Sequence, residues 1–224
     1  MCNAALPTVE QITRLQTEAV RRWHEEPIDA PEPMPSCLGG PARLDGPADQ
    51  ARGSLPEPSF LSLVRQQHAC NFRLWHEEDK ARSRTASDRQ IADVKRTIDQ
   101  LNQQRNDCIE RLDDAIASVL RQAGIVPVAN APLNTETPGS AIDRLSIMSI
   151  RIYHYREQLD RVDTPPAVQQ SVTQRLSTCE QQFAELSDSL QQLLNDICSG
   201  IKRHKTYHQM KMYNDPALNP MIDG

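Results

Sequence analysis

Apolar side chains recur at steps of three and four residues along most of this chain, which is the spacing of an amphipathic α-helix. The pattern predicts helices over residues 8–26, 59–82 and 87–124. Thr8 and Ser87 each begin a capping box, in which the first and fourth residues satisfy each other's backbone amides. Local sequence therefore predicts where the first and third helices begin.

Two further helices follow in the second half of the chain. Ser140 is the expected N-cap of a helix over residues 141–161, whose apolar side chains point to nearly all sides and predict a central position. Thr164 is the expected cap of the last helix, with prolines at its start. Apolar residues then follow a heptad pattern over residues 172–197. Packing within the chain explains this pattern, and a homodimer through the heptad face is the alternative.

The sequence predicts an all-α fold: a bundle of four to five long antiparallel helices in a single domain, residues 1–224. Aromatic residues make up only 4% of the chain, which favours helices over a β-sandwich. Residues 27–58 hold half of the sixteen prolines and half of the eight glycines, so we expect a long loop or disordered insert, a lid or a tether. The tail, residues 205–224, contains tyrosine and methionine and is expected to pack on the bundle.

Composition excludes several classes of function. The net charge is −5 with both signs interspersed, which argues against binding to nucleic acid. No run approaches the roughly 18 apolar residues of a membrane span, and the start of the chain lacks a signal-peptide core, so we expect a cytoplasmic protein. The six cysteines are scattered singly, which favours reduced thiols over a disulfide framework or a zinc site.

A stripe of polar residues on the second predicted helix is the strongest indication of a functional site. At about 100° per residue, His68, Asn71, Trp75, Asp79 and Arg82 align where a helix normally buries apolar side chains. Buried polar side chains need partners, and clusters of them are enriched at functional sites. The sequence therefore predicts a site along this stripe.

Polar residues on two other predicted helices extend this candidate site. Asn102 and Arg105 interrupt the apolar face of the third helix, and antiparallel packing would place them opposite the stripe. The fourth helix carries further polar residues in a buried setting. The candidate catalytic residues are His68, Asp79, Asp143 and His154. The candidate ligand-binding residues are Asn71, Trp75, Asn102, Arg105 and Tyr153.

These residue types suggest acid–base chemistry on a small molecule. A histidine beside a carboxylate, as in His68 with Asp79 or His154 with Glu157, serves as a general acid or base. The guanidinium of Arg105 suits a carboxylate or phosphate, and neighbouring amides suit hydroxyl groups. A purely structural role is the competing interpretation, because a buried polar network also fixes the register of a bundle.

A metal-dependent bundle enzyme is a further alternative. His76 with Asp79, and His154 with Glu157, are spaced three residues apart on predicted helices. Di-iron bundles use the order Glu-x-x-His twice and two additional glutamates, whereas here the order is reversed and additional carboxylates are not evident. The sequence therefore assigns no metal ligand and no cofactor. It also contains no Gly-rich phosphate loop and no nucleophile elbow.

Long segments resemble a bacterial family known as domain of unknown function 4254. The matching segments include Gln67-His68, Leu74-Trp75-His76, residues 91–107, Ile142-Asp143-Arg144-Leu145-Ser146-Ile147, Ile152-Tyr153-His154 and residues 211–220. The resemblance covers residues 60–220 and implies no specific activity, although it suggests sugar or specialised-metabolite biosynthesis. The leading hypothesis is an enzyme acting on a polar or anionic, sugar-linked metabolite. A non-catalytic helical partner or scaffold of a biosynthetic enzyme is the alternative.

Overall fold

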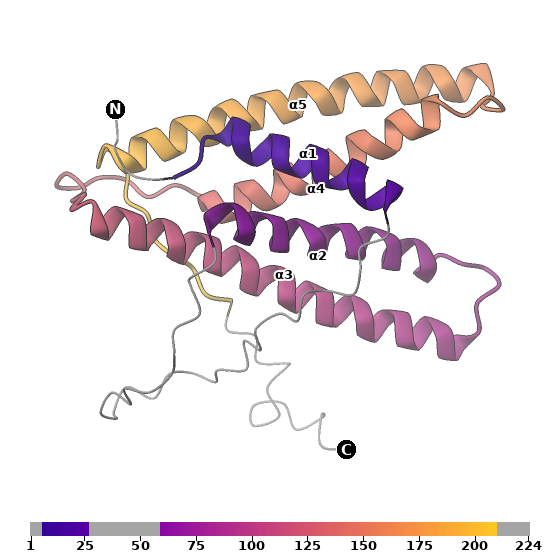
Figure 1. Ribbon diagram of the computed structural model, residues 1–224, viewed down its shortest axis with the longest axis horizontal. Coiled ribbons are helices and arrows are strands. Elements are labelled where there is room, and N and C mark those ends of the chain that lie inside the picture. The colour runs from indigo at the N-terminus through magenta and orange to yellow at the C-terminus, as the bar shows by residue number, and fades with distance from the viewer. Residues whose placement is uncertain (1–5, 27–58, 210–224) are drawn as a thin grey trace.

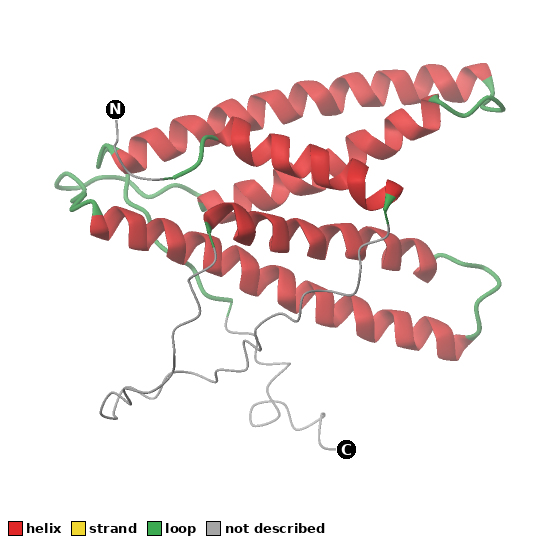
Figure 2. Cartoon of the chain, viewed as in Figure 1, coloured by secondary structure: helices red, strands yellow, loops and turns green. Residues whose placement is uncertain are grey.

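Five α-helices form the part of the chain that the computed structural model describes, residues 6–26 and 59–209 (Figures 1 and 2). They are α1 (Val9–Glu25), α2 (Phe60–Ala81), α3 (Asp88–Gln122), α4 (Pro138–Leu159) and α5 (Pro166–Cys198). These residues contain no strand, only an isolated bridge between Leu133 and Arg203. The predicted all-α bundle is confirmed. The predictions for residues 27–58 and 210–224 fall outside the described residues.

The capping boxes at Thr8 and Ser87 form as predicted, each with a glutamine three residues later. The cap predicted for α4 is wrong, because Thr137 and not Ser140 accepts the cap hydrogen bond, from the backbone N–H of Ser140. Pro138 then occupies the first turn, where its missing N–H costs nothing. The helix therefore begins three residues earlier than its apolar pattern indicated.

The cap predicted for α5 is also wrong. Its N-cap is Pro165, which has no side-chain hydrogen bond to offer, and the hydroxyl of Thr164 donates instead to the carbonyl of Gln158 at 3.3 Å. The start of α5 is therefore set by the fixed backbone angle of consecutive prolines rather than by a capping side chain.

Helix α4 occupies the centre of the bundle, as its apolar residues predicted. It packs against each of the other four helices. Figure 1 shows α1, α2 and α4 running in one direction and α3 and α5 returning in the other. The largest fully buried apolar side chains come from all five helices and are Ile12, Val20, Val64, Leu112, Ile116, Ile142, Leu145, Ile150 and Leu190.

The heptad face of α5 packs within the chain. Its buried residues include Val172, Cys179, Leu190 and Ile197, and the helix lies against α4 and α1. Intramolecular packing thus accounts for the 172–197 pattern, and a homodimer through this face stays a prediction. None of the described helices is long and apolar enough to cross a membrane.

The described end of the chain returns along α3. The ring Nε2 of His204 lies 2.8 Å from the carbonyl of Asp113, and His208 Nδ1 lies 2.7 Å from the carboxylate of Glu110. Glu110 also accepts a hydrogen bond from the backbone N–H of Gln209. Residues 205–209 therefore approach α3, and the rest of the predicted tail contact lies outside the described residues.

Candidate functional site

The polar residues of α2 and α3 meet around one cavity of about 460 Å³, which we call the α2–α3 pocket. Asn71 and Trp75 from α2 line it together with Asn102 and Arg105 from α3. Four of the predicted ligand-binding residues thus share one pocket, because antiparallel packing brings the two polar faces together. The other lining residues are Leu74, Glu78, Asp79, Arg82 and Ile147.

Arg105, which lines the pocket, pairs with the buried Asp143, which does not line it. The Nε of Arg105 lies 3.6 Å from Oδ1 of Asp143, and the arginine side chain is 28% exposed. Burial raises the pKa of the Asp143 carboxyl, against the opposing effect of the Arg105 charge. Arg105 Nε is buried and has no hydrogen-bond partner among the described residues. The guanidinium therefore lies beside a carboxylate that does not accept a hydrogen bond from its Nε.

A buried network of hydrogen bonds supports Asp143 from the side of α2. The amide groups of Gln67 and Asn71 donate to its Oδ1 at 2.6 and 2.9 Å. The same Asn71 amide lies 2.9 Å from the hydroxyl of Ser146, which also contacts His68 Nδ1 at 2.7 Å. These contacts fix the rotation of α2 against α4, so the network determines which side chains reach the pocket.

His68 belongs to this network rather than to a pocket lining. It is 0% exposed and stacks on the ring of Trp23 with 5.0 Å between centroids. Burial lowers the pKa of His68 to about 3, so the imidazole is neutral at physiological pH. The structure does not make the predicted pair of His68 with Asp79, because the partner of His68 is Ser146. Three helical turns separate the two residues along α2.

Asp79 lies at the rim of the α2–α3 pocket. Its side chain is 64% exposed, and its carboxylate lies 3.6 Å from the guanidinium of Arg82. Arg82 also donates to the backbone carbonyl of Glu78 at 2.7 Å and contacts its carboxylate. The charge of Arg82 is thus matched by two neighbouring acids, whereas Arg105 lines the pocket with Asp143 as its one ion-pair partner among the described residues.

A second cavity of about 510 Å³ adjoins the first, and we call it the histidine pocket. Trp75 and Asp79 line both cavities. His154 lies here, stacked on Trp75 with 4.9 Å between centroids, and its Nδ1 lies 3.0 Å from the carboxylate of Glu157. The predicted pair of His154 with Glu157 is therefore present in the structure.

Tyr153 and His24 are placed differently from the sequence-based expectation. Tyr153 lines neither pocket and instead stacks on His24 with 4.2 Å between centroids. His24 was not among the candidate residues, although it joins His76 and His154 in this pocket. Its only sequence signal is Trp23-His24-Glu25-Glu26, which repeats the letters of residues 75–78.

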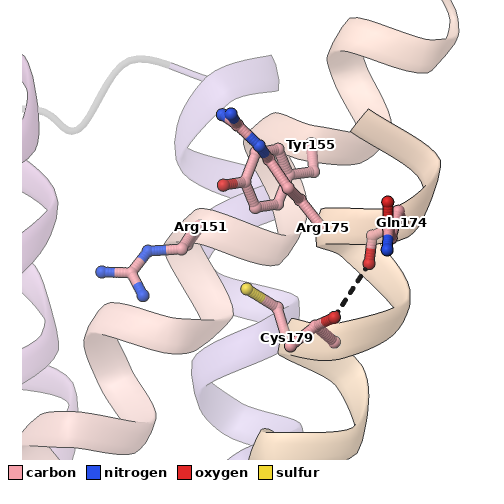
Figure 3. Close-up of a pocket in the computed structure, with 6 residues that line it drawn as sticks. Arg151, Tyr155, Gln174, Arg175 and Cys179 are labelled. Atoms are coloured by element: carbon pink, nitrogen blue, oxygen red, sulfur yellow. Dashed lines mark hydrogen bonds between the residues drawn. The ribbon is translucent and has the colours of Figure 1, made fainter. Parts of the chain in front are cut away.

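A third pocket lies between α4 and α5 and contains none of the predicted site residues. Its volume is about 330 Å³. Figure 3 shows Arg151 and Tyr155 from α4 beside Arg175 and Cys179 from α5. Arg151 and Tyr155 also line the histidine pocket, whereas Gln174, Arg175 and Thr178 are exposed on α5. The α2–α3 and histidine pockets therefore remain the candidate site.

Residues 61–206 match the family described as Protein of unknown function (DUF4254), and the chain belongs to this family. The match runs from the first turn of α2 through α5 to the first residues of the tail, and it includes both candidate pockets except for His24. No curated protein and no solved structure matches the chain. The family description carries no activity, so function has to be argued from the site.

Proposed function

We propose that the protein is an enzyme that binds a small polar metabolite through a carboxylate or phosphate group in the α2–α3 pocket. The position of Arg105 carries this proposal, since the residue lines the pocket and its one ion-pair partner among the described residues, Asp143, lies 3.6 Å away, beyond hydrogen-bond distance. A guanidinium presents paired donors that match a carboxylate or phosphate. Asp143 would orient this arginine rather than exchange protons with the ligand.

The remaining lining residues suit a hydroxylated, sugar-linked ligand. Asn102 supplies an amide group, and Trp75 supplies a flat apolar surface. Asn71 also lines the pocket, but its amide N–H groups already donate to Asp143 and Ser146. Convergent polar groups on a partly apolar wall are typical of metabolite sites. Because Trp75 and Asp79 also line the histidine pocket, a ligand anchored on Arg105 would extend its other end toward the histidines.

We further propose that this enzyme works in the bacterial cytoplasm in a biosynthetic pathway. Cys70, Cys108 and Cys179 are buried thiols that form no disulfide, as expected in a reducing compartment. The bacterial and biosynthetic parts of the proposal rest on the family resemblance alone.

A thermal-shift screen tests the binding proposal. The full chain would be screened against sugar nucleotides, phosphorylated sugars and common carboxylic metabolites. A ligand at a hundred times its dissociation constant stabilises the folded state by about 2.7 kcal/mol, a readily measured change in melting temperature. We expect one ligand class to stabilise the wild type and to lose at least about tenfold in affinity with Arg105→Lys, which keeps the charge but not the paired donors.

Arg96→Lys provides the matched control for this substitution. Arg96 lies on the same helix, pairs with Asp93 in solvent and lines neither pocket. Equal ligand affinity in Arg96→Lys and the wild type would support a specific role for Arg105. The proposal is wrong if no ligand class stabilises the protein, or if Arg105→Lys binds as tightly as the control.

A further inference from the structure

Three histidines from three helices converge in the histidine pocket. His24 lies near the end of α1, His76 on α2 and His154 on α4. The ring centroids of the three pairs are 5.0, 5.3 and 5.9 Å apart. One potential ligand atom from each residue lies within 4.8 Å of the others. Among the described residues this is the one cluster of three such side chains with that geometry.

The hydrogen bonds of two of these rings leave Nε2 free to bind a cation. Nδ1 of His24 lies 2.8 Å from the carbonyl of Val20, and Nδ1 of His154 lies 3.0 Å from the carboxylate of Glu157. A carbonyl or carboxylate oxygen only accepts, so both Nδ1 atoms carry the proton and a neutral ring has its lone pair on Nε2. Both Nε2 atoms are buried without a hydrogen-bond partner among the described residues.

This pattern of partners is typical of histidines that bind metals. Metal-ligating histidines commonly donate their second N–H to a backbone carbonyl or a carboxylate, which fixes the tautomer and the ring orientation. Val20 and Glu157 occupy these supporting positions for His24 and His154. Aromatic neighbours also hold the rings, since His24 stacks on Tyr153 and His154 stacks on Trp75.

We propose that His24, His76 and His154 form a binding site for a divalent transition-metal ion, with Zn²⁺ as the preferred occupant. Three neutral imidazoles favour zinc and its neighbours over magnesium or calcium, which prefer oxygen ligands. Zn–N bonds of about 2.0–2.1 Å place tetrahedral ligands about 3.3 Å apart, so the rings must move inward slightly when the ion binds.

A tetrahedral Zn²⁺ bound by three imidazoles has one further coordination position. Three protein ligands with an open fourth position are characteristic of catalytic rather than structural zinc, and such an ion activates a bound water. Asp79 and Glu157 line the same cavity, so the ion would lie among two carboxylates and the indole of Trp75. The inference rests on the histidine geometry alone and does not require a metabolite in the α2–α3 pocket.

The test is a Zn²⁺ titration of the full chain, purified without a histidine tag and stripped with a chelator. We expect the wild type to bind one Zn²⁺ per chain by calorimetry. Co²⁺ in place of Zn²⁺ should give the visible absorption bands of a tetrahedral site. His24→Gln, His76→Gln and His154→Gln should each weaken Zn²⁺ binding at least about a hundredfold, and Glu157→Gln should weaken it about tenfold or more.

His208→Gln is the matched control, because His208 also contacts a glutamate but lies outside the cluster. It should bind Zn²⁺ as the wild type does, and so should Arg105→Lys, which separates this site from the metabolite site. Circular dichroism of the stripped variants checks folding. If His76→Gln unfolds, Zn²⁺ binding by His24→Gln decides the test. His24 lies one position from the end of α1, where a substitution disturbs the helix least. The proposal is overturned if the wild type binds no Zn²⁺, or if folded His24→Gln and His154→Gln bind it unchanged.

Discussion

At the scale of single residues, Gly139 shows how closely α4 approaches α3. Its backbone N–H donates to Asp113 at 2.8 Å, and an added Cβ would lie 2.7 Å from the carbonyl oxygen of Ile109. Gly139→Ala should therefore lower the free energy of unfolding by about 1–3 kcal/mol, as overpacking does. Urea denaturation measures the change.

Gly124 is the control for this prediction. It adopts a φ of +65°, but no atom lies within 4 Å of an added Cβ. Asparagine tolerates this backbone conformation, so Gly124→Asn should cost about 1 kcal/mol or less. The prediction is wrong if Gly139→Ala is as stable as the wild type, because α3 and α4 would then move apart without a loss of stability.

The buried histidine of the network predicts a loss of stability in acid. The unfolded state protonates His68 near pH 6.5, whereas the folded state resists protonation until its pKa of about 3 is approached. The unfolded state thus binds more protons in between, and stability falls by up to about 1.4 kcal/mol per pH unit as the pH drops. The contribution is fully present above pH 6.5.

His68→Gln isolates this effect, since it keeps a polar group for Ser146 but does not titrate. Asp143 has the opposite sign, because its raised pKa makes the folded state take up a proton first as the pH falls. The wild type and His68→Gln both contain Asp143, so its contribution cancels when their stabilities are compared. Unfolding free energies measured between pH 7 and 4 should fall more steeply for the wild type than for His68→Gln, and parallel curves would contradict the prediction.

At the scale of elements, the start of α4 depends on a capping side chain. The Thr137 hydroxyl accepts from the backbone N–H of Ser140 at 3.2 Å, so Thr137→Ala should cost about 1 kcal/mol of stability. Ser140→Ala keeps the donor and should cost less. Chemical denaturation of both variants compares the two positions, and a larger loss with Ser140→Ala would restore the cap that the sequence indicated.

At the scale of the whole molecule, α5 contributes its apolar face to the intramolecular core. Leu190 is 1% exposed and belongs to the cluster that contains Leu145 and Leu112. Leu190→Ala should lower the free energy of unfolding by about 2–5 kcal/mol without changing the molar mass in solution. Light scattering with denaturation tests both parts, and a dimeric wild type that dissociates in this variant would favour the heptad-face homodimer.

The sequence by itself determined the helices and the class of fold. Apolar spacing and caps act within a few residues, so Thr8 and Ser87 specified two helix starts. The apolar residues on nearly all sides of α4 specified its central place. Local pattern placed the caps of α4 and α5 wrongly where prolines fix the backbone. It also identified the amides and guanidinium of the α2–α3 pocket, because polar residues on an apolar face require partners.

Only the tertiary structure decided which polar side chains share a site. The rotation and order of helices arise from packing between distant segments, and no local pattern encodes them. His68 was therefore expected beside Asp79 but lies in the core on Ser146. His24 looked like an ordinary residue at a helix end, and it joins His76 and His154 because α1, α2 and α4 run side by side in the same direction.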